Sequence, residues 1–417
     1  MKSCFWTALA ALIVLPLAGH FASAQEWTRF RGPNGTGISS DSFPTHFDDK
    51  SIAWKITLPG GGHSSPVLWG KKIFITCAND HTAERMILCI DATNGSTIWK
   101  QQIESHTYRQ NGDNSYATST PCVDADHLYV CWSTPEELSL AAFTHDGKKI
   151  WEQQFGSFIS QHGSGQSPIV EGNIVLLTDL NEGPNSYIFG IDRNTGKILW
   201  KSPRTRSDKF SPATPCIYTP AGGKPEAVFL SKSEGFLGID PQTGKTIWQA
   251  PGVFDARPVG SPVLSDGLIF GSCGDGPYGH QLVAVRPGTE SSPGKQVWRT
   301  TDSTPYVPTM VAKEGLLFCW GDAGLVLCRK QKTGEIVWQQ RVPGSYYSSP
   351  VCAGNILYNI NKRGEVVAIA ASDNFQLLGQ TPLGEKCHAT PAIVDGFMYI
   401  RTYTHLYCIK GKRNLAR

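Results

Sequence analysis

The sequence predicts an all-β protein, an eight-bladed β-propeller built from four-stranded antiparallel blades. Seven tryptophans recur at intervals of 45, 52, 49, 48, 50 and 40 residues, and one more step of 40 reaches Leu378 in a similar stretch. A period of 40 to 50 residues indicates one supersecondary unit copied many times. The tryptophans of this series are Trp54, Trp99, Trp151, Trp200, Trp248, Trp298 and Trp338.

A hydroxyl residue followed by proline forms a second series with almost the same period. The prolines are separated by 55, 47, 47, 47, 46, 42 and 41 residues, with Val307-Pro308 as the variant copy. The other copies are Ser65-Pro66, Thr120-Pro121, Ser167-Pro168, Thr214-Pro215, Ser261-Pro262, Ser349-Pro350 and Thr390-Pro391. We refer to these positions as the hydroxyl landmarks. Because proline is tolerated at the first residue of a strand, each landmark predicts the start of a strand.

The residues before each tryptophan predict a hairpin. The stretch from Ile191 to Trp200 reads IDRNTGKILW, and the stretch from Ile239 to Trp248 reads IDPQTGKTIW. Glycine at the turn takes positive φ, and the aspartate side chain accepts bonds from the turn's N–H groups. Ala284 to Trp298 looks like the same hairpin with an inserted Pro-Gly-Ser-rich loop. With the landmark strand and the strand after it, each unit has four strands, as in a propeller blade.

The two ends of the chain predict that the propeller closes into a ring. The unit from Thr390 has three strands and lacks a tryptophan strand, whereas Ile52 to Lys55 is a tryptophan strand without a unit. Pairing them completes an eighth blade and removes two exposed sheet edges. We therefore expect a signal peptide over residues 1–24, an N-terminal extension over 25–50, a propeller over 51–410 and a basic tail over 411–417.

The first residues have the pattern of a secretory signal. Lys2 precedes a mostly apolar stretch, and Ala22-Ser23-Ala24 has the small-x-small cleavage pattern. We expect an exported protein, periplasmic, extracellular or associated with the cell surface, with no membrane span after signal removal. The formal net charge is +3 and the basic residues form no run outside the short tail, so no nucleic-acid partner is expected.

The chain has twelve cysteines, and Cys4 lies within the predicted signal. Most of the others stand where other units carry small apolar residues, so we interpret them mainly as buried side chains. Two disulfides are possible: Cys319 with Cys328, if a two-residue turn places them opposite each other, and Cys122 with Cys131. Neither pair has histidines nearby at zinc-site spacing.

The repeated Asp-x-x-Thr-Gly-Lys-x-x-Trp unit resembles the pyrroloquinoline quinone (PQQ) repeat. That resemblance implies an eight-bladed propeller whose tryptophans wedge between neighbouring blades. The family includes quinoprotein dehydrogenases, which bind PQQ and Ca²⁺ in the central funnel, and non-catalytic propellers similar to outer-membrane assembly factor B, which bind proteins. The opening segment Trp27 to Gly37 (WTRFRGPNGTG) resembles that of exported bacterial proteins of this type. The chain lacks the adjacent cysteine pair of methanol-oxidising enzymes and a Cys-x-x-Cys-His motif.

Candidate binding residues gather on one predicted face, opposite the Asp-Thr-Gly-Lys turns. This loop face carries the blade-to-blade connections, which must line the channel. The candidates for ligand or cofactor binding are His63, Tyr116, His162, Arg257, Tyr306, Tyr347 and His388. If a Ca²⁺ ion is bound, Asn181, Glu182 and Asp275 are the candidate oxygen ligands.

Two functions from different classes are compatible with this sequence. In the first, the chain is a non-catalytic binding or scaffold protein that takes a protein or small-molecule ligand at the loop face and central funnel. In the second, it is a dehydrogenase that oxidises an alcohol or sugar with PQQ and Ca²⁺ as cofactors. The sequence identifies no catalytic residue and assigns no cofactor to the first function. The absence of a complete catalytic motif favours the first function.

Overall fold

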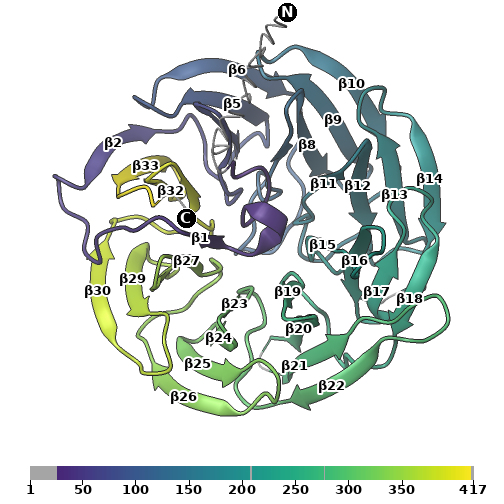
Figure 1. Ribbon diagram of the computed structural model, residues 1–417. Helices are drawn as coiled ribbons and strands as arrows, with labels where there is room; N and C mark the ends of the chain where they lie inside the picture. Colours follow the sequence, from purple (N-terminus) through teal and green to yellow (C-terminus); the bar gives the residue numbers. More distant parts are fainter. Residues whose placement is uncertain (1–25, 207–208, 277, 415–417) are drawn as a thin grey trace, which may run out of the picture.

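The computed structural model describes residues 26–206, 209–276 and 278–414. It confirms the predicted fold: eight four-stranded antiparallel blades surround a central axis, with the tryptophan strands at the rim (Figure 1). Among the described residues, the only helix is the short 3₁₀ element η1 (Pro33–Gly35). The predicted signal peptide lies outside the described residues. No helix within the described ranges has the length and apolar character needed to cross a bilayer.

The blades follow one another in chain order, and each runs from an inner to an outer strand. Blade 1 consists of β3 (Val67–Trp69), β4 (Lys72–Ala78), β5 (Arg85–Asp91) and β6 (Thr97–Ile103), and blade 2 of β7 (Cys122–Val123), β8 (His127–Ser133), β9 (Leu138–Thr144) and β10 (Lys149–Gln154). Blade 3 consists of β11 (Ile169–Glu171), β12 (Ile174–Asp179), β13 (Tyr187–Asp192) and β14 (Ile198–Pro203), and blade 4 of β15 (Cys216–Tyr218), β16 (Glu226–Ser231), β17 (Gly235–Ile239) and β18 (Thr246–Ala250). Blade 5 consists of β19 (Val263–Ser265), β20 (Leu268–Asp275), β21 (Tyr278–Arg286) and β22 (Lys295–Thr300), and blade 6 of β23 (Val311–Lys313), β24 (Leu316–Trp320), β25 (Leu325–Lys330) and β26 (Ile336–Arg341). Blade 7 consists of β27 (Val351–Ala353), β28 (Ile356–Ile360), β29 (Glu365–Ala370) and β30 (Leu377–Pro382), and blade 8 of β31 (Ala392–Val394), β32 (Phe397–Arg401), β33 (His405–Lys410) and β2 (Ile52–Thr57).

Blade 8 closes the ring as predicted, because its outer strand comes from the other end of the chain. Strand β2 pairs antiparallel with β33, and Trp54 lies opposite Cys408. A small residue also faces the wedge tryptophan in the six blades from 1 to 6: Cys89, Ala142, Gly190, Gly238, Ala284 and Cys328. A small side chain leaves room for the indole, which explains why cysteine is common at this position.

The wedge tryptophans join neighbouring blades, as the resemblance implies. Trp200 donates its indole N–H to the carbonyl of Pro241 in the turn of blade 4, at 3.0 Å. A Cβ on Gly244 of that turn would lie 2.4 Å from the indole. Trp54, Trp99, Trp151, Trp298 and Trp338 make the corresponding bond to the next blade. Trp248 instead donates to the Glu226 carboxylate at 2.6 Å, because the inserted loop of blade 5 replaces the usual turn.

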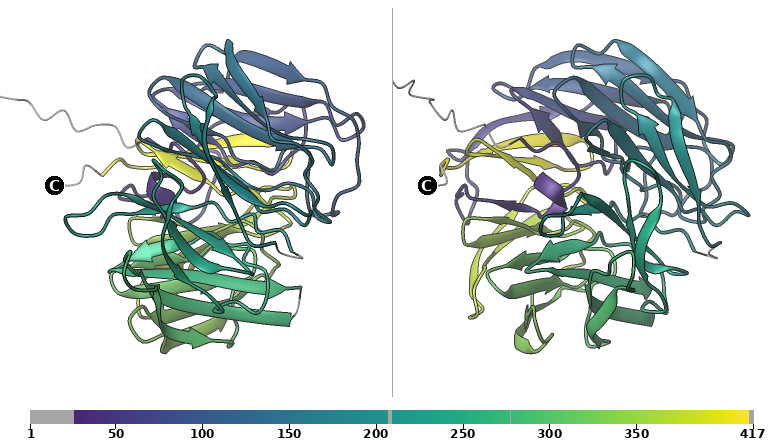
Figure 2. Two further views of the ribbon diagram at one scale, coloured as in Figure 1. Left: turned by 90° about the vertical axis from the view of Figure 1, so that its right-hand side faces the viewer. Right: turned by 45° about the vertical axis from the view of Figure 1, so that its right-hand side comes forward.

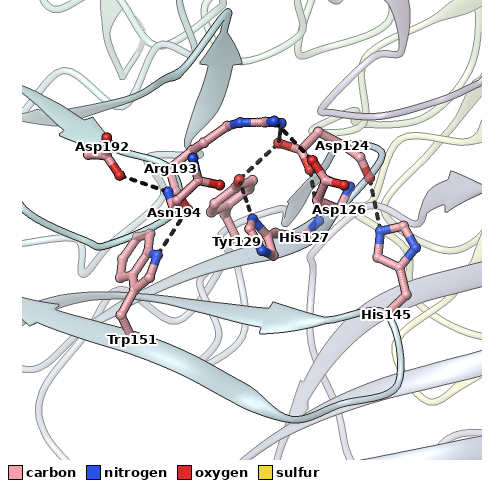
Figure 3. A network of polar contacts seen from close by, with 9 residues as sticks. All are labelled: Asp124, Asp126, His127, Tyr129, His145, Trp151, Asp192, Arg193 and Asn194. Atoms are coloured by element: carbon pink, nitrogen blue, oxygen red, sulfur yellow. Dashed lines mark hydrogen bonds and ion pairs between the residues drawn. The ribbon is translucent and has the colours of Figure 1, made fainter.

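An ion-pair network also links blades 2 and 3 on the turn face (Figure 3). Arg193, from a turn of blade 3, contacts Asp124 and Asp126 of blade 2, both at 2.9 Å. Tyr129 donates its hydroxyl to Asp124 at 2.8 Å. Burial raises the pKa of Asp124, but the backbone N–H groups of Asp126 and His127 and the Arg193 guanidinium outweigh it, so the net pKa is lowered.

Neither of the two possible disulfides forms, because the eleven described cysteines are free and buried. In blade 6, four residues separate β24 from β25, and Phe318 rather than Cys319 lies opposite Cys328. Cys319 therefore points to the other face of the sheet from Cys328. In blade 2, Cys122 lies opposite Tyr129, whereas Cys131 lies opposite Leu140. The interpretation of these cysteines as small buried side chains is confirmed.

The N-terminal extension crosses the axis of the ring and closes one end of the channel. Its η1 turn lies at the centre of the ring (Figure 1), toward the side that carries the described C-terminal residues (Figure 2). The Trp27 carbonyl accepts a bond from Leu68 of blade 1, at 2.9 Å, and β1 (Ile38–Ser39) pairs in parallel with β27 of blade 7. We call residues 26–43 the plug.

Buried polar side chains hold the plug against the inner strands. Arg31 is fully buried and donates to the carbonyls of Pro350 and Met310, at 2.6 and 2.8 Å. Burial lowers the pKa of Arg31 to about 9. Arg29 donates to the Pro215 carbonyl, and the Asn34 amide exchanges two bonds of 2.7 Å with the backbone of Ile217. These donors satisfy inner-strand carbonyls that would otherwise be buried without partners.

Candidate functional site

A ring of hydroxyl side chains surrounds the axis above the plug. The backbone N–H of Ser261 donates to Thr309 Oγ1 at 2.9 Å, and the N–H of Thr309 donates to Ser349 Oγ at 2.9 Å. The same link joins Ser65 to Thr120, Thr120 to Ser167, Thr214 to Ser261, Ser349 to Thr390 and Thr390 back to Ser65. Seven of the eight junctions between blades are therefore joined by a hydroxyl landmark.

The structure corrects the position of the sixth hydroxyl landmark. Strand β23 begins at Val311, and Thr309 supplies the ring hydroxyl, so Val307-Pro308 precedes the landmark by two residues. The sequence pattern misplaced it because Met310 stands where the other copies have proline.

All eight landmark hydroxyls line a central cavity of about 540 Å³. The residue two positions before each hydroxyl lines the same cavity, because side chains alternate along extended backbone. This second ring consists of His63, Thr118, Gly165, Pro212, Val259, Val307, Tyr347 and His388. Three of its members, on blades 7, 8 and 1, form what we call the aromatic side: Tyr347, His388 and His63. The members on blades 3 to 6 are small or aliphatic. Phe30 of the plug also lines the cavity.

Two stacked histidines dominate the aromatic side. The rings of His63 and His388 lie 4.2 Å apart with an angle of 24° between their planes, and Tyr347 packs its ring edge-on against His388 at 5.1 Å. Burial, followed by the nearby His388, lowers the pKa of His63 well below its usual value. Burial together with Lys362 lowers the pKa of His388 to about 4. Both rings are therefore neutral at pH 7, and the buried Nδ1 of His63 has no hydrogen-bond partner among the described residues.

The long connection between blades 1 and 2 reaches across to this aromatic side. Asp113 of this connection accepts bonds from Lys362 Nζ at 2.5 Å and from the Tyr347 hydroxyl at 3.2 Å. The backbone carbonyl of Asp113 lies 3.1 Å from His388 Nδ1. Burial raises the pKa of Asp113, but the bond and the charge of Lys362 outweigh it and leave the pKa lowered.

A cationic cluster occupies another part of the wall. Arg257 is 5% exposed and donates through Nε, at 2.9 Å, and through Nη2 to the hydroxyl of Tyr306. Its Nη2 also lies 3.1 Å from His162 Nε2. Burial, followed by the Arg257 charge, lowers the pKa of His162, so this ring is a neutral acceptor. Burial raises the pKa of Tyr306, which keeps its phenol protonated.

Six of the seven predicted binding residues line this one cavity: His63, His162, Arg257, Tyr306, Tyr347 and His388. Tyr116 does not. A turn at Tyr116–Ala117 redirects its side chain, whose hydroxyl donates to the Tyr108 carbonyl at 3.0 Å.

The candidate metal ligands are not brought together. Asp275 lines the cavity and pairs with Lys209 at 3.4 Å. Asn181 and Glu182 lie outside the cavity lining, and the Glu182 carboxylate accepts the backbone N–H of Gln161 at 2.8 Å. The described part of the chain contains no cluster of three or more histidine, cysteine, aspartate or glutamate residues suited to a metal.

Sequence reasoning missed the cavity role of the landmark hydroxyls and of the plug. The sequence shows the hydroxyls as a repeat, but the proline after each of them indicates only the start of a strand. Side chains alternate along an extended segment, so the residue two positions before each hydroxyl faces the same side as that hydroxyl. This spacing is the signal in the sequence that identifies the second ring. For the plug, the sequence offered Arg29 and Arg31 close to glycine and proline residues, with no periodic partner to show their position.

The fold and the site define a propeller whose channel is closed at one end by its own N-terminal segment and lined by hydroxyl and ring side chains. The family model described as outer membrane protein assembly factor BamB matches residues 83–340 and 280–374. The chain belongs to this family. No curated protein matches its sequence.

Solved structures share the fold at low sequence identity. BamB from Moraxella catarrhalis is 15% identical, with a TM-score of 0.61, over 88% of this chain and 99% of that one. Quinohemoprotein alcohol dehydrogenase from Comamonas testosteroni is 14% identical, with a TM-score of 0.66, over 94% of this chain and 82% of that one. The computationally designed Ika8 protein is 10% identical, with a TM-score of 0.61, over 88% of this chain and 100% of that one. These likenesses establish the propeller architecture alone.

Proposed function

We propose that this chain is an exported, non-catalytic binding protein that holds a ligand in the central cavity on its loop face. The observation that carries this proposal is the composition of the cavity: eight hydroxyls, neutral rings and one buried arginine, closed on one side by the plug. A concave site with a few placed polar groups is typical of ligand binding. The export follows from the predicted signal at the N-terminus.

The residues of the cavity do not fit PQQ with Ca²⁺. A Ca²⁺ site needs several converging oxygen ligands, most of them carboxylates or carbonyls. The two carboxylates that line the cavity, Asp113 and Asp275, are each bonded to a lysine. No tryptophan is among the described residues that line the cavity, so none is placed to stack on a quinone there.

A quinone titration tests the proposal. Purified protein without residues 1–24 is mixed with PQQ and Ca²⁺, and binding is followed by tryptophan fluorescence while dye-linked oxidation of alcohols and sugars is measured. We expect no saturable quinone binding at high micromolar concentration and no turnover. Saturable binding together with turnover would contradict the proposal and identify a dehydrogenase. A Gly165→Trp variant, which fills the cavity, is the control that distinguishes quinone bound in the cavity from quinone bound elsewhere.

A further inference from the structure

The charge of Arg257 is not balanced by a carboxylate. Lysines neutralise both acidic residues of the cavity wall, because Lys362 pairs with Asp113 and Lys209 with Asp275. No described carboxylate lies within ion-pair distance of Arg257, although this residue is almost fully buried. A buried charge is costly unless it is paired. The wall therefore offers a site for an anionic group from outside the chain.

The donors around Arg257 are suited to a carboxylate. Its Nη1 makes no hydrogen bond to a described residue, whereas Nε and Nη2 are fixed by Tyr306. The protonated phenol of Tyr306 accepts these bonds and donates none to the described residues, so its own proton is available to a ligand oxygen. A guanidinium with a neighbouring hydroxyl donor matches the two oxygens of a carboxylate.

The rest of the cavity is suited to a hydroxylated ring. Seven landmark hydroxyls accept a backbone N–H, and none of the eight donates a bond to another described residue. Their protons therefore remain available as a ring of donors. Above them, the rings of His63, His388 and Tyr347 form one side and Val259 and Val307 part of the other. A pyranose combines such features, because its C–H face packs on rings while its hydroxyls take hydrogen bonds.

We propose that the cavity binds an acidic saccharide of the uronic acid type, with its carboxylate on Arg257 and Tyr306 and its sugar ring against the aromatic side. A second observation supports a ligand at the aromatic side: the Nδ1 of His63 is buried, and the residue itself is only 9% exposed, yet this nitrogen has no partner among the described residues. Because His63 lines the cavity, a small rotation of its ring on ligand binding would bring this nitrogen to a hydroxyl of the sugar. The inference rests on the proposed binding function and specifies its ligand.

Isothermal titration calorimetry with digalacturonic acid tests the inference, with the neutral disaccharide galactobiose as the matched ligand. We expect saturable binding of one digalacturonate and at least tenfold weaker binding of galactobiose. Arg257→Gln should weaken digalacturonate binding at least tenfold. Arg363→Gln, which changes an arginine of the loop face outside the cavity lining, should leave the affinity unchanged. Circular dichroism and the melting temperature establish that each variant is folded. If Arg257→Gln does not fold, the affinities of the unchanged protein for digalacturonate and for galactobiose still show whether the carboxylate is recognised.

Three results would overturn the inference, and one of them separates it from the proposed function. Equal affinity for the two disaccharides, or digalacturonate binding unaffected by a folded Arg257→Gln variant, removes the carboxylate from recognition. The third result is that digalacturonate does not bind, whereas trialanine binds in an Arg257-dependent way and trialanine amide does not bind. The ligand would then be a peptide carboxylate instead of a sugar, and the proposed binding function would still hold. Quinone-dependent turnover would instead overturn the proposed function itself.

Discussion

The imidazole of His63 lies face to face with that of His388, with ring centroids 4.2 Å apart, where blades 8 and 1 meet. Stacking at this distance requires that the two rings are not both protonated, because two imidazolium charges would repel each other in a buried site. The pair therefore links the aromatic side of the cavity to the pH of the surroundings.

Acidification should destabilise the fold through this pair. The folded pKa of His388, about 4, lies below its ordinary value of 6.5, so the unfolded chain binds protons first as the pH falls. The neutral His388 therefore contributes about 3 kcal/mol to the free energy of unfolding. This contribution is fully present above pH 6.5 and is lost as the pH falls toward 4. Urea denaturation of the unchanged protein and of His388→Gln should give a weaker pH dependence in the variant. Equal pH dependence, or an NMR titration of His388 near pH 6.5, would contradict this prediction.

The hydroxyl ring should contribute to stability at individual junctions. In Thr309→Val the shape is kept but the N–H of Ser261 loses its acceptor. We expect a loss of about 1–3 kcal/mol in the free energy of unfolding, the cost of leaving a buried donor unpaired. Thr214→Val is the matched control, because the Thr214 hydroxyl accepts no backbone N–H from the described residues. Equal losses in the two variants, measured by urea denaturation, would count against the ring.

The propeller was predictable because its determinants repeat. The wedge Trp54 and the three strands from Thr390 identified the closed ring, since a closed blade removes exposed sheet edges. Part of the cavity lining follows from the sequence: six of the seven residues named near the landmarks line the cavity, whereas Tyr116 does not, because a local turn interrupts the alternation. Cys319 and Cys328 show the same limit. Their register depends on a four-residue turn where a two-residue turn was assumed, and one residue of shift moves a side chain to the other face.

The plug was not predictable, because its contacts are not periodic and several of them join residues about 180 to 320 positions apart, as in Asn34 with Ile217 and Arg31 with Pro350. We expect Arg31→Gln to lower the free energy of unfolding by about 3 kcal/mol, because several buried carbonyls lose their donor. Arg413→Gln, which breaks an exposed pair with Asp395, should change it by less than about 1 kcal/mol. Chemical denaturation measures both. An Arg31 variant as stable as the Arg413 variant would show that the plug does not depend on this guanidinium.

The wedge between blades 3 and 4 can be tested through the glycine beneath it. Gly244 has φ of +72°, and a Cβ there would lie 2.4 Å from the Trp200 indole, whereas Gly252 has φ of +68° with open space around it. Gly252→Ala should therefore cost only the strain of the left-handed backbone, about 1 kcal/mol. Gly244→Ala should cost about 2–4 kcal/mol, because it also displaces the indole and its bond to Pro241.

A double-mutant cycle separates the clash from the backbone strain. When Gly244→Ala is made in a Trp200→Phe background, the smaller ring no longer fills the space above the turn. The alanine should then cost little more than it does at Gly252, and the two changes should be non-additive by about 1–2 kcal/mol. Thermal and urea denaturation of the four proteins gives the coupling energy. Strict additivity would mean that Trp200 does not press on Gly244, and that the recurring spacing of tryptophan and glycine along this chain has another cause than the wedge.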